Sequence, residues 1–321
     1  MGKLLIICGS TATGKTRLAL YLAKVFSGEL VSADSKQVYR GMNIGTGKEL
    51  PPGSKYITGK GELPGYYLVN GVKIWGYDLV GPKEGFSVGE YLRITGKIMA
   101  DIYKRKLLPI LVGGTGLYIK AQVDGFETTG VPKNDVLRKT IEGRSVDDLY
   151  NHLGQLDSVK AASLNISDRK NPRRLIRAIE VAQWKIKHNS KKVTYDEFHD
   201  RVNPLFVGLK ATNIIIDDII EARVYKRIDQ GFEKEVRNLI NKGLSWNSQA
   251  MDSLGYKQWQ PYFLGEETKK TSIDAWIRAE KAYAKRQMTW FKKDKRINWF
   301  DITSATLIDD VEKLVKRWYK D

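Results

Sequence analysis

The chain has 321 residues and a formal net charge of +17, with 54 lysines and arginines against 37 acidic residues. Apolar residues make up 42% of the chain, which is enough for a sizeable core, and no apolar run reaches the roughly 18 residues of a membrane-spanning helix. One cysteine excludes an internal disulfide, and with three histidines it offers no typical structural zinc site. We therefore expect a cytoplasmic protein without a membrane segment, and the charge favours an anionic partner such as nucleic acid.

The first elements of the chain form the pattern of a phosphate-binding loop. Residues 3–8 are apolar and predict a buried parallel strand, and residues 16–26 carry apolar side chains at helical spacing. Between them lies GSTATGKT (9–16), whose backbone amides and helix N-terminus would surround an anion. Lys15 supplies a mobile cation, and the Thr16 hydroxyl can bind Mg²⁺. The motif predicts a di- or triphosphate site formed by Gly9, Thr11, Ala12, Thr13, Gly14, Lys15 and Thr16.

A second strand and a hairpin follow this loop. Residues 30–32 predict a short strand, and Asp34 comes just past its end. Residues 66–80 contain two β-rich stretches on either side of Asn70 and Gly71, a pair typical of a type I′ hairpin turn. Strand ends of parallel sheets are where ligands bind, so Asp34 is a candidate general base.

The next elements complete an alternation of strands and helices. Ser87 and Glu90 form a capping box that predicts the start of a helix extending to about residue 106. Residues 107–114 predict another buried strand that ends in glycines, and residues 117–123 predict a helix. The alternation indicates a parallel α/β sheet flanked by helices.

From about residue 124 the pattern changes. Residues 124–200 show several helical patterns and no convincing strand, which predicts a helical insertion, whereas residues 202–211 indicate a return to the sheet. We expect the catalytic core to comprise residues 1–123 and 201–321. The rest of the chain is predicted to be mainly helical, and its longest helical patterns are 218–242 and 273–293.

The sequence shows no clear second acid of the kind that holds magnesium in P-loop NTPases. The strand at 107–112 ends in glycines rather than in an acid. Asp217 and Asp218 are weak candidates, and capping of the following helix is their simpler interpretation.

Six segments resemble the tRNA dimethylallyltransferase family, in the same order and at plausible spacing. They are GSTATGKT, ADSKQVYRGMNIGTGK, FSVGEY, LPILVGGTGLYIKA, NPRRLIRAIEV and AKRQMTWF, and together they span residues 9–291. The resemblance implies a P-loop kinase-like core with a helical tRNA-binding insertion at 124–200. It implies transfer of a dimethylallyl group from dimethylallyl diphosphate to N6 of the adenosine next to the anticodon, position 37, with release of diphosphate. It also implies Mg²⁺ as cofactor, and we expect a monomer.

The resemblance assigns roles to individual residues. Asp34 matches the general base, Thr115 a polar residue beside the reacting centre, and Lys15 a group that neutralises the leaving diphosphate. Thr16 would act there through Mg²⁺, and Arg223 would contact the diphosphate. The implied tRNA contacts are Asp34, Ser35, Lys36, Gln37, Thr115, Arg173, Arg174, Leu175, Ile176, Arg177, Lys285 and Arg286.

Two basic runs support an RNA partner independently of the resemblance. Residues 169–192 contain nine lysines and arginines and one acid, and residues 278–296 contain eight against two acids. Cations contact phosphates, and Tyr283, Trp290 and Phe291 within the second run could stack on splayed bases. Helical spacing places Arg173, Arg174 and Arg177 together as an exposed three-cation patch.

The chain departs from the family pattern at two places. The family usually has two histidines before an aspartate where this chain reads IWGYD (74–78), and the segment before it is longer and includes the predicted hairpin. Ile219 occupies a place where the family commonly has an arginine near the diphosphate, and Arg227 is a possible substitute further along the helix. The chain also lacks a C-terminal zinc module, which favours the bacterial type.

Two other functions remain open from the sequence. An enzyme that prenylates free AMP, ADP or ATP would share the P-loop but would not need the basic insertion and the basic C-terminal run. A P-loop NTPase or kinase that binds RNA would need a magnesium-holding acid, for which only Asp217 or Asp218 is available.

Overall fold

The computed structural model describes residues 2–48, 50–125, 128, 130–188 and 202–320. The chain divides into two compact units, one formed by Met1–Asp124 with Phe198–Asp321 and the other by Gly125–Glu197. We refer to the first as the sheet unit and to the second as the helical unit.

The sheet unit is built on a mixed sheet. Within the described residues, eight strands form it in the order β3-β4-β5-β2-β6-β1-β7-β8. The strands from β5 to β8 in this order pair in parallel, and β3 and β4 form an antiparallel extension at one edge. The strands are β1 (Gly2–Gly9), β2 (Gly28–Ser32), β3 (Lys55–Ile57), β4 (Tyr66–Val69), β5 (Val72–Trp75), β6 (Leu108–Val112), β7 (Val202–Lys210) and β8 (Ile297–Asp301).

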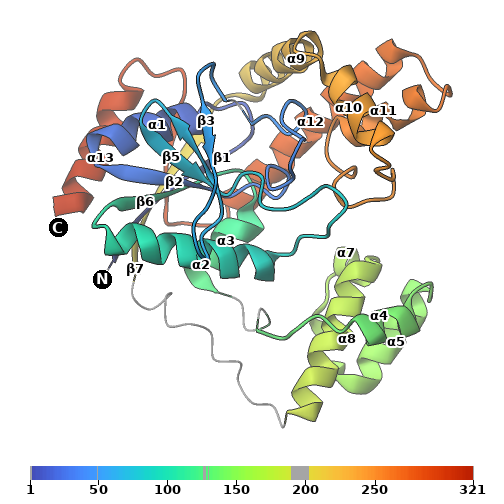
Figure 1. Ribbon diagram of the computed structural model, residues 1–321. Helices are drawn as coiled ribbons and strands as arrows, with labels where there is room; N and C mark the ends of the chain where they lie inside the picture. Colours follow the sequence, from blue (N-terminus) through green and yellow to red (C-terminus); the bar gives the residue numbers. More distant parts are fainter. Residues whose placement is uncertain (1, 49, 126–127, 129, 189–201, 321) are drawn as a thin grey trace. The chain divides into compact units, whose positions relative to one another are not determined.

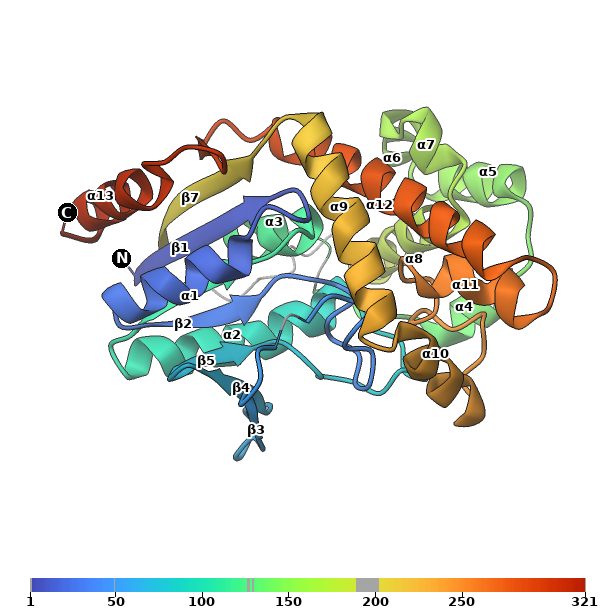
Figure 2. The same cartoon turned by 90° about the horizontal axis from the view of Figure 1, so that it is seen from above.

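Helices cover both faces of this sheet (Figure 1). Buried side chains of α1 and α13 pack with those of β1, β6 and β7 in the main core, and α2 and α3 cover the other face. Helices α9 and α12 lie side by side near the carboxyl end of β1 (Figure 2). The helices of the sheet unit are α1 (Lys15–Val25), α2 (Val88–Lys104), α3 (Gly116–Asp124), α9 (Asn213–Asp229), α10 (Phe232–Asn241), α11 (Tyr256–Phe263), α12 (Lys269–Phe291) and α13 (Leu307–Lys320). None of the helices described is both long and apolar enough to span a membrane.

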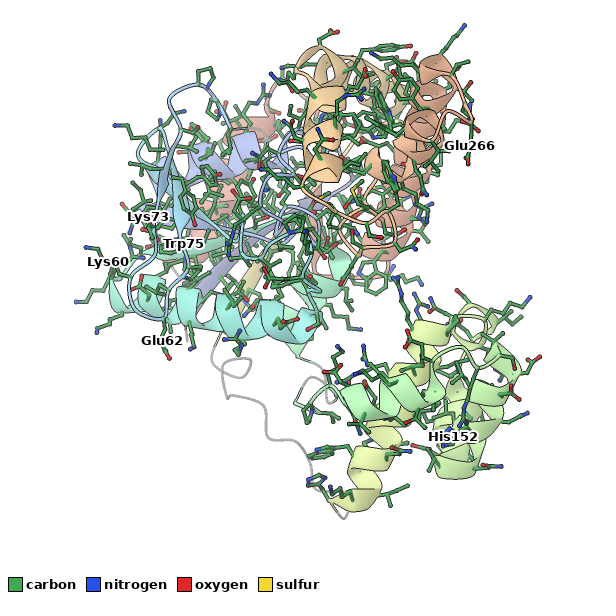
Figure 3. All side chains as sticks on the ribbon, turned by 45° about the vertical axis from the view of Figure 1, so that its right-hand side comes forward. Lys60, Glu62, Lys73, Trp75, His152 and Glu266 are labelled. Atoms are coloured by element: carbon green, nitrogen blue, oxygen red, sulfur yellow. The ribbon has the colours of Figure 1, made fainter. Side chains whose placement is uncertain are left out.

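The parallel α/β core and its local signals are confirmed. Asn70 and Gly71 both have positive φ, 51° and 84°, as a type I′ turn between β4 and β5 requires. The Ser87 side chain accepts a hydrogen bond from the Glu90 amide at 3.2 Å, and Glu90 accepts one from the Ser87 amide at 2.8 Å. On the hairpin of β4 and β5, the Lys73 ammonium lies over the rings of Tyr66 and Trp75, and Figure 3 shows Lys73 beside Trp75.

Three predictions for the C-terminal half are wrong. The pattern at 218–242 is two helices, because the chain turns at Gly231 with φ 95°. Thr212, not an aspartate, caps α9, so Asp217 and Asp218 lie inside that helix. The mainly helical prediction for this half misses strand β8, because the five residues INWFD carry no β-type alternation.

The helical unit has its own apolar core. Its helices are α4 (Asp135–Ile141), α5 (Val146–Leu156), α6 (Ser158–Ser163), α7 (Ile166–Arg169) and α8 (Pro172–Lys187). Leu175 and Ile179 of α8 are fully buried against Leu149 and Leu153 of α5. The assignment of Leu175 to the tRNA contacts is therefore wrong for its side chain, which is closed inside this core, whereas Ile176 lies at the margin.

The predicted three-cation patch on α8 is also wrong as a set. Arg173 and Arg174 are exposed, and Arg174 pairs with Asp168. The Arg177 guanidinium instead donates hydrogen bonds to the Glu180 carboxylate at 3.0 Å and to the carbonyls of Thr128 and Val131. Arg177 therefore contributes to the structure of the helical unit and is not simply an exposed cation.

The partner of Arg177 is a buried carboxylate. Glu180 is 2% exposed, and it also accepts hydrogen bonds from the Arg138 guanidinium at 2.6 and 2.9 Å and from the Asn134 amide. Burial alone would raise the pKa of Glu180, but the hydrogen bonds from Arg138, Asn134 and Arg177 hold it below its ordinary value. The ion pairs of Glu180 with Arg138 and Arg177 stabilise the folded helical unit at neutral pH. This contribution is lost as pH falls through the lowered pKa of Glu180.

We predict that Arg177→Ala and Arg173→Ala have different effects on the helical unit. Arg177→Ala removes bonds to a buried charge and to two carbonyls, so the opening free energy of α8 should fall by about 1–2 kcal/mol. Arg173→Ala should change it by no more than about 0.5 kcal/mol, as at other exposed positions. Native-state hydrogen exchange of the α8 amides in the full chain measures both, and equal values for the two variants would contradict the assignment.

Candidate active site

Three loops meet at the carboxyl edge of the sheet because β1, β6 and β2 are neighbours. The loop after β1 is GSTATGKT, the loop after β6 contains Thr115, and the loop after β2 contains Asp34. Backbone hydrogen bonds continue between these loops beyond the strands: the Ala33 amide donates to Val112 at 2.7 Å, and the Thr115 amide donates to Ala33 at 3.1 Å. The predicted base, the predicted reacting-centre residue and the phosphate loop therefore lie at the same edge of the sheet.

The phosphate loop has the conformation that anion binding requires. Gly14 has φ 76° and precedes α1 without a side-chain cap, so the first amides of the helix remain available to an anion. The Thr13 hydroxyl donates to the Ser10 carbonyl at 2.9 Å, and the Lys15 ammonium donates to the same carbonyl at 2.5 Å. Lys15 is thus folded over the loop.

A pocket of about 500 Å³ opens beside this loop. Residues 12–14 of the loop form one wall, and Arg223 of α9 lies in the same lining. The structure thus brings three of the predicted diphosphate residues, Ala12, Thr13 and Gly14, together with Arg223, and it places the apolar Ile219 in the same pocket. The rest of the lining is Arg17, Leu18, Tyr21, Leu209, Ile302, Leu307 and Ile308.

The sequence suggests Arg227 as a replacement for the family arginine at position 219, but its side chain forms an ion pair inside the protein. Its guanidinium pairs with Glu280 of α12 at 2.5 Å, and both side chains are more than nine-tenths buried. The ring of Trp276 lies beside the guanidinium, and the Trp276 indole N–H donates to Glu280 at 2.9 Å. Arg227 therefore joins α9 to α12 inside the protein.

The environment of Asp34 suits a proton acceptor. The side chain is partly buried, and its carboxylate accepts a hydrogen bond from the Lys36 amide at 2.8 Å. Burial raises the pKa of Asp34, and the amides of Lys36 and Gln37 and the charge of Lys15 oppose the rise without cancelling it. Thr115 is adjacent, because its hydroxyl accepts a hydrogen bond from the Ser35 amide at 3.0 Å.

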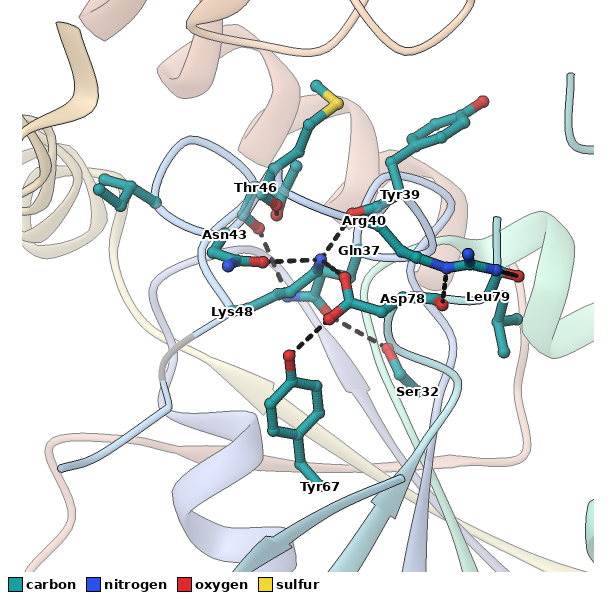
Figure 4. A network of polar contacts seen from close by, with 12 residues as sticks. Ser32, Gln37, Tyr39, Arg40, Asn43, Thr46, Lys48, Tyr67, Asp78 and Leu79 are labelled. Atoms are coloured by element: carbon teal, nitrogen blue, oxygen red, sulfur yellow. Dashed lines mark hydrogen bonds and ion pairs between the residues drawn. The ribbon is translucent and has the colours of Figure 1, made fainter. Parts of the chain in front are cut away.

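Two of the residues that follow Asp34 are engaged within the protein. The Gln37 amide accepts from the Ser32 hydroxyl at 3.0 Å and donates to the carbonyls of Thr46 and Gly47 (Figure 4). The Lys36 ammonium donates to the Gln249 carbonyl. Contact of Ser35, Lys36 and Gln37 with tRNA stays a prediction, and for Gln37 it requires an exchange of partners.

A buried lysine supports the loop that carries these residues, and sequence reasoning missed it. Lys48 is 5% exposed, its ammonium pairs with Asp78, and it donates to the Tyr39 carbonyl at 2.7 Å and to the Asn43 side chain at 3.0 Å. The Tyr67 hydroxyl on β4 donates to the other Asp78 oxygen at 2.5 Å (Figure 4). Burial lowers the pKa of Lys48, and the charge of Asp78 opposes this. The segment with the atypical IWGYD sequence thus anchors the loop through Asp78.

A second support comes from α10. The Glu235 carboxylate accepts hydrogen bonds from the consecutive amides of Asn43, Ile44 and Gly45 at 2.8–3.0 Å, and from the Tyr256 hydroxyl at 2.5 Å. No local pattern in the sequence marks Glu235, because all these partners except Tyr256 lie about 190 residues earlier in the chain.

Helix α12 presents different residues to the site and to solvent. Lys285 and Arg286 are exposed, as expected for phosphate contacts, and Trp290 is 45% exposed. Phe291 is 3% exposed, so its predicted stacking on a base is wrong. Tyr283 is half-buried, and its hydroxyl lies near enough to Asp34, Thr115 and Gln287 for these groups to influence its pKa.

The described residues contain no group of three or more histidine, cysteine, aspartate or glutamate side chains that could hold a metal ion. Thr16 is half-buried at the first turn of α1, where its hydroxyl follows the phosphate-binding amides. A single protein ligand, the Thr16 hydroxyl, fits Mg²⁺ that arrives with a diphosphate, because magnesium commonly takes its remaining ligands from phosphate oxygens and water.

Comparison with known proteins, over nearly the whole sequence, identifies the family of this chain. A family model described as IPP transferase matches residues 37–294, and one described as isopentenyl transferase matches residues 2–55. The tRNA dimethylallyltransferase of Anoxybacillus flavithermus is 35% identical over 315 residues, with 96% of this chain and 93% of the relative covered. That of Dictyoglomus turgidum is 36% identical over 316 residues, covering 97% and 91%.

Solved structures share the fold. The full-length tRNA isopentenylpyrophosphate transferase of Bacillus halodurans superposes with a TM-score of 0.70 at 30% identity, covering 99% of this chain and 96% of that one. A eukaryotic dimethylallyltransferase acting on tRNA has a TM-score of 0.77 at 21% identity, covering 98% and 78%, which supports the fold alone. The family model covers most of the chain and the relatives align over nearly its whole length, so this protein belongs to the IPP transferase family.

Proposed function

We propose that the protein transfers a dimethylallyl group from dimethylallyl diphosphate to N6 of adenosine 37, next to the anticodon in tRNA, and releases diphosphate. Family membership and the names of its relatives support prenyl transfer to tRNA. The observation that carries the chemistry is the position of Asp34, a carboxylate with a raised pKa, on the loop beside the phosphate loop and Thr115.

The proposed reaction is a displacement at the allylic carbon. The N6 nitrogen forms a bond to that carbon, the carbon–oxygen bond to diphosphate breaks, and its electron pair leaves with the diphosphate. Asp34 accepts the N6 proton, because the amine is a poor nucleophile while it keeps that proton. Lys15, Arg223 and the first amides of α1 stabilise the charge that develops on the diphosphate. Thr16 would hold Mg²⁺, which when bound neutralises further diphosphate charge.

The acceptor must leave its base stack to reach this site. Enzymes that modify bases within RNA bind the target nucleotide splayed out, and exposed cations hold the flanking phosphates. Arg173 and Arg174 in the helical unit and Lys285 and Arg286 on α12 are such cations. The single buried Cys8 fits a reducing compartment, and we propose that the enzyme acts in the cytoplasm as a monomer.

Labelled dimethylallyl diphosphate distinguishes this function from the alternatives. The protein is incubated with the label and either bulk tRNA or AMP, and ATP turnover is measured in parallel. Label in tRNA supports the proposal, and label in AMP supports prenylation of a free nucleotide. ATP turnover without transfer of label supports an NTPase.

We predict that Asp34→Asn lowers kcat by about 10²–10⁴-fold while tRNA binding stays nearly unchanged, because the amide keeps the size of the carboxylate but cannot accept the proton. The wild-type rate should rise with pH as Asp34 loses its proton, over a window above that of an ordinary aspartate because its pKa is raised. The variant should lack this rise. Rate–pH profiles with tRNA affinities measure both, and an equal loss of binding and rate would assign Asp34 to structure or base reading.

We predict that Lys15→Ala weakens binding of the donor and slows departure of the diphosphate, because the ammonium lies over the phosphate loop. Inorganic pyrophosphate should compete with dimethylallyl diphosphate in the wild type. A Lys24→Ala variant, on the last turn of the same helix, is the control for the charge change. Competition by ATP that is far stronger than competition by the prenyl donor would contradict the donor assignment.

We predict that the double variant Arg173→Ala, Arg174→Ala weakens tRNA binding and flattens its salt dependence, by a slope of about 0.7–0.9 for each phosphate that an arginine no longer neutralises. Arg177 is left intact because it supports the fold of the helical unit. Lys60→Ala, an exposed lysine on the loop between β3 and β4 (Figure 3), is the charge control. Unchanged affinity and salt slope would mean that these arginines are only solvated.

A further inference from the structure

One side chain of α12 joins two of the catalytic loops. The Gln287 amide oxygen accepts a hydrogen bond from the Thr11 amide in the phosphate loop at 2.7 Å. Its nitrogen donates to the Gly114 carbonyl in the loop after β6 at 2.9 Å. Gln287 is 5% exposed, so both bonds are shielded from water. A single amide therefore spans from the predicted diphosphate loop to the loop that carries Thr115.

The fit around this amide is close. A Cβ atom at Gly114 would lie 2.1 Å from the Gln287 nitrogen, so only glycine lets the carbonyl approach at this point. The Thr11 amide is committed to Gln287, which leaves the amides further along the loop for the diphosphate. Thr11 thus serves the site by fixing the loop, and the prediction that its own amide binds diphosphate would require Gln287 to move away.

Tyr283 lies beside this connection. It is one turn before Gln287 on α12, and its hydroxyl lies near the side chains of Gln287, Thr115 and Asp34, which influence its pKa. Burial raises the pKa of its hydroxyl, and the nearby negative charge of Asp34 raises it further, so the hydroxyl remains protonated. The Thr115 hydroxyl in turn accepts a hydrogen bond from the amide of Ser35, the residue after Asp34. The hydrogen bonds thus run from Thr11 through Gln287 to Gly114, and from its neighbour Thr115 to Ser35 beside the base.

We infer that Gln287 is a positioning residue that holds the diphosphate loop at a fixed separation from Thr115 and, through Thr115, from Asp34, and that Tyr283 beside it supports this arrangement. The inference rests on the proposed prenyl transfer. An in-line displacement needs the leaving diphosphate, the allylic carbon and the attacking nitrogen in register, and small misplacements cost large factors in rate. Gln287 acts on the reaction through the loops, because both polar atoms of its amide are bonded to them.

Single-turnover transfer of label to saturating tRNA tests this inference. Gln287→Met keeps the length of the side chain and removes both bonds, so the rate constant should fall by about 10–100-fold. Gln287→Glu keeps the acceptor for the Thr11 amide and removes the donor to the Gly114 carbonyl. Tyr283→Phe removes one hydroxyl. The rate constant should therefore fall less in these two variants than in Gln287→Met. Because the two residues belong to one network, the effects of Gln287→Met and Tyr283→Phe should combine to less than their product.

The matched control is Thr289→Ala, on the same helix. The Thr289 hydroxyl donates only to the Lys285 carbonyl one turn earlier, so its removal should leave the rate unchanged. Donor and tRNA affinities should stay close to those of the wild type in the positioning variants, and the amplitude of the single turnover should be complete. A reduced amplitude with an unchanged rate constant would mean that Gln287 only stabilises the fold, and would overturn the inference.

Hydrogen exchange reads the connection without any transfer. The Thr11 amide should be protected in the wild type and should exchange faster in Gln287→Met, whereas protection that survives in Gln287→Met would overturn the inference. A wild-type enzyme that transfers no label contradicts the proposed function instead, and the exchange experiment still decides whether Gln287 fixes the loop.

Discussion

The pairing of β1, β6 and β2 as neighbouring parallel strands is the constraint on which the rest of the site depends. Such strands lie about 4.8 Å apart, so the loops at their carboxyl ends are close before any side chain is considered. Here the backbone ladder continues past the strands, from Ala33 to Val112 and from Thr115 to Ala33. The phosphate loop and the proposed base are therefore held at one sheet edge by main-chain geometry.

The loops themselves are completed by helices from the C-terminal half. Glu235 binds three consecutive amides of the loop at 43–45, and Gln287 bridges the phosphate loop and the Thr115 loop. Both contacts join segments separated by more than 170 residues. Gln287 is buried, so its amide must be fully hydrogen-bonded to be tolerated. The site is thus a product of the whole sheet unit, and α12 serves it on one face while exposing Lys285 and Arg286 on another.

Features with a strong local signature could be predicted from the sequence. The glycine pattern at 9–16, the Asn70-Gly71 turn and the Ser87 capping box each depend on residues within a few positions of one another. Lys48, Glu235 and Gln287 could not be found in this way, because their partners are distant in sequence and an isolated lysine, glutamate or glutamine has no periodic signal. Helical spacing grouped Arg173 with Arg177, but it could not show that Glu180 draws Arg177 inward.

The central claim is that the phosphate loop holds a leaving diphosphate while Asp34 accepts a proton from N6. A crystal structure of the full chain with a tRNA anticodon stem-loop and an unreactive thio analogue of dimethylallyl diphosphate tests it most directly. We predict the diphosphate on the first amides of α1 with Lys15 beside it, and the extruded adenine with N6 within about 3 Å of the Asp34 carboxylate. A diphosphate bound away from residues 12–16, or an adenine whose N6 lies beyond the reach of Asp34, would contradict the account.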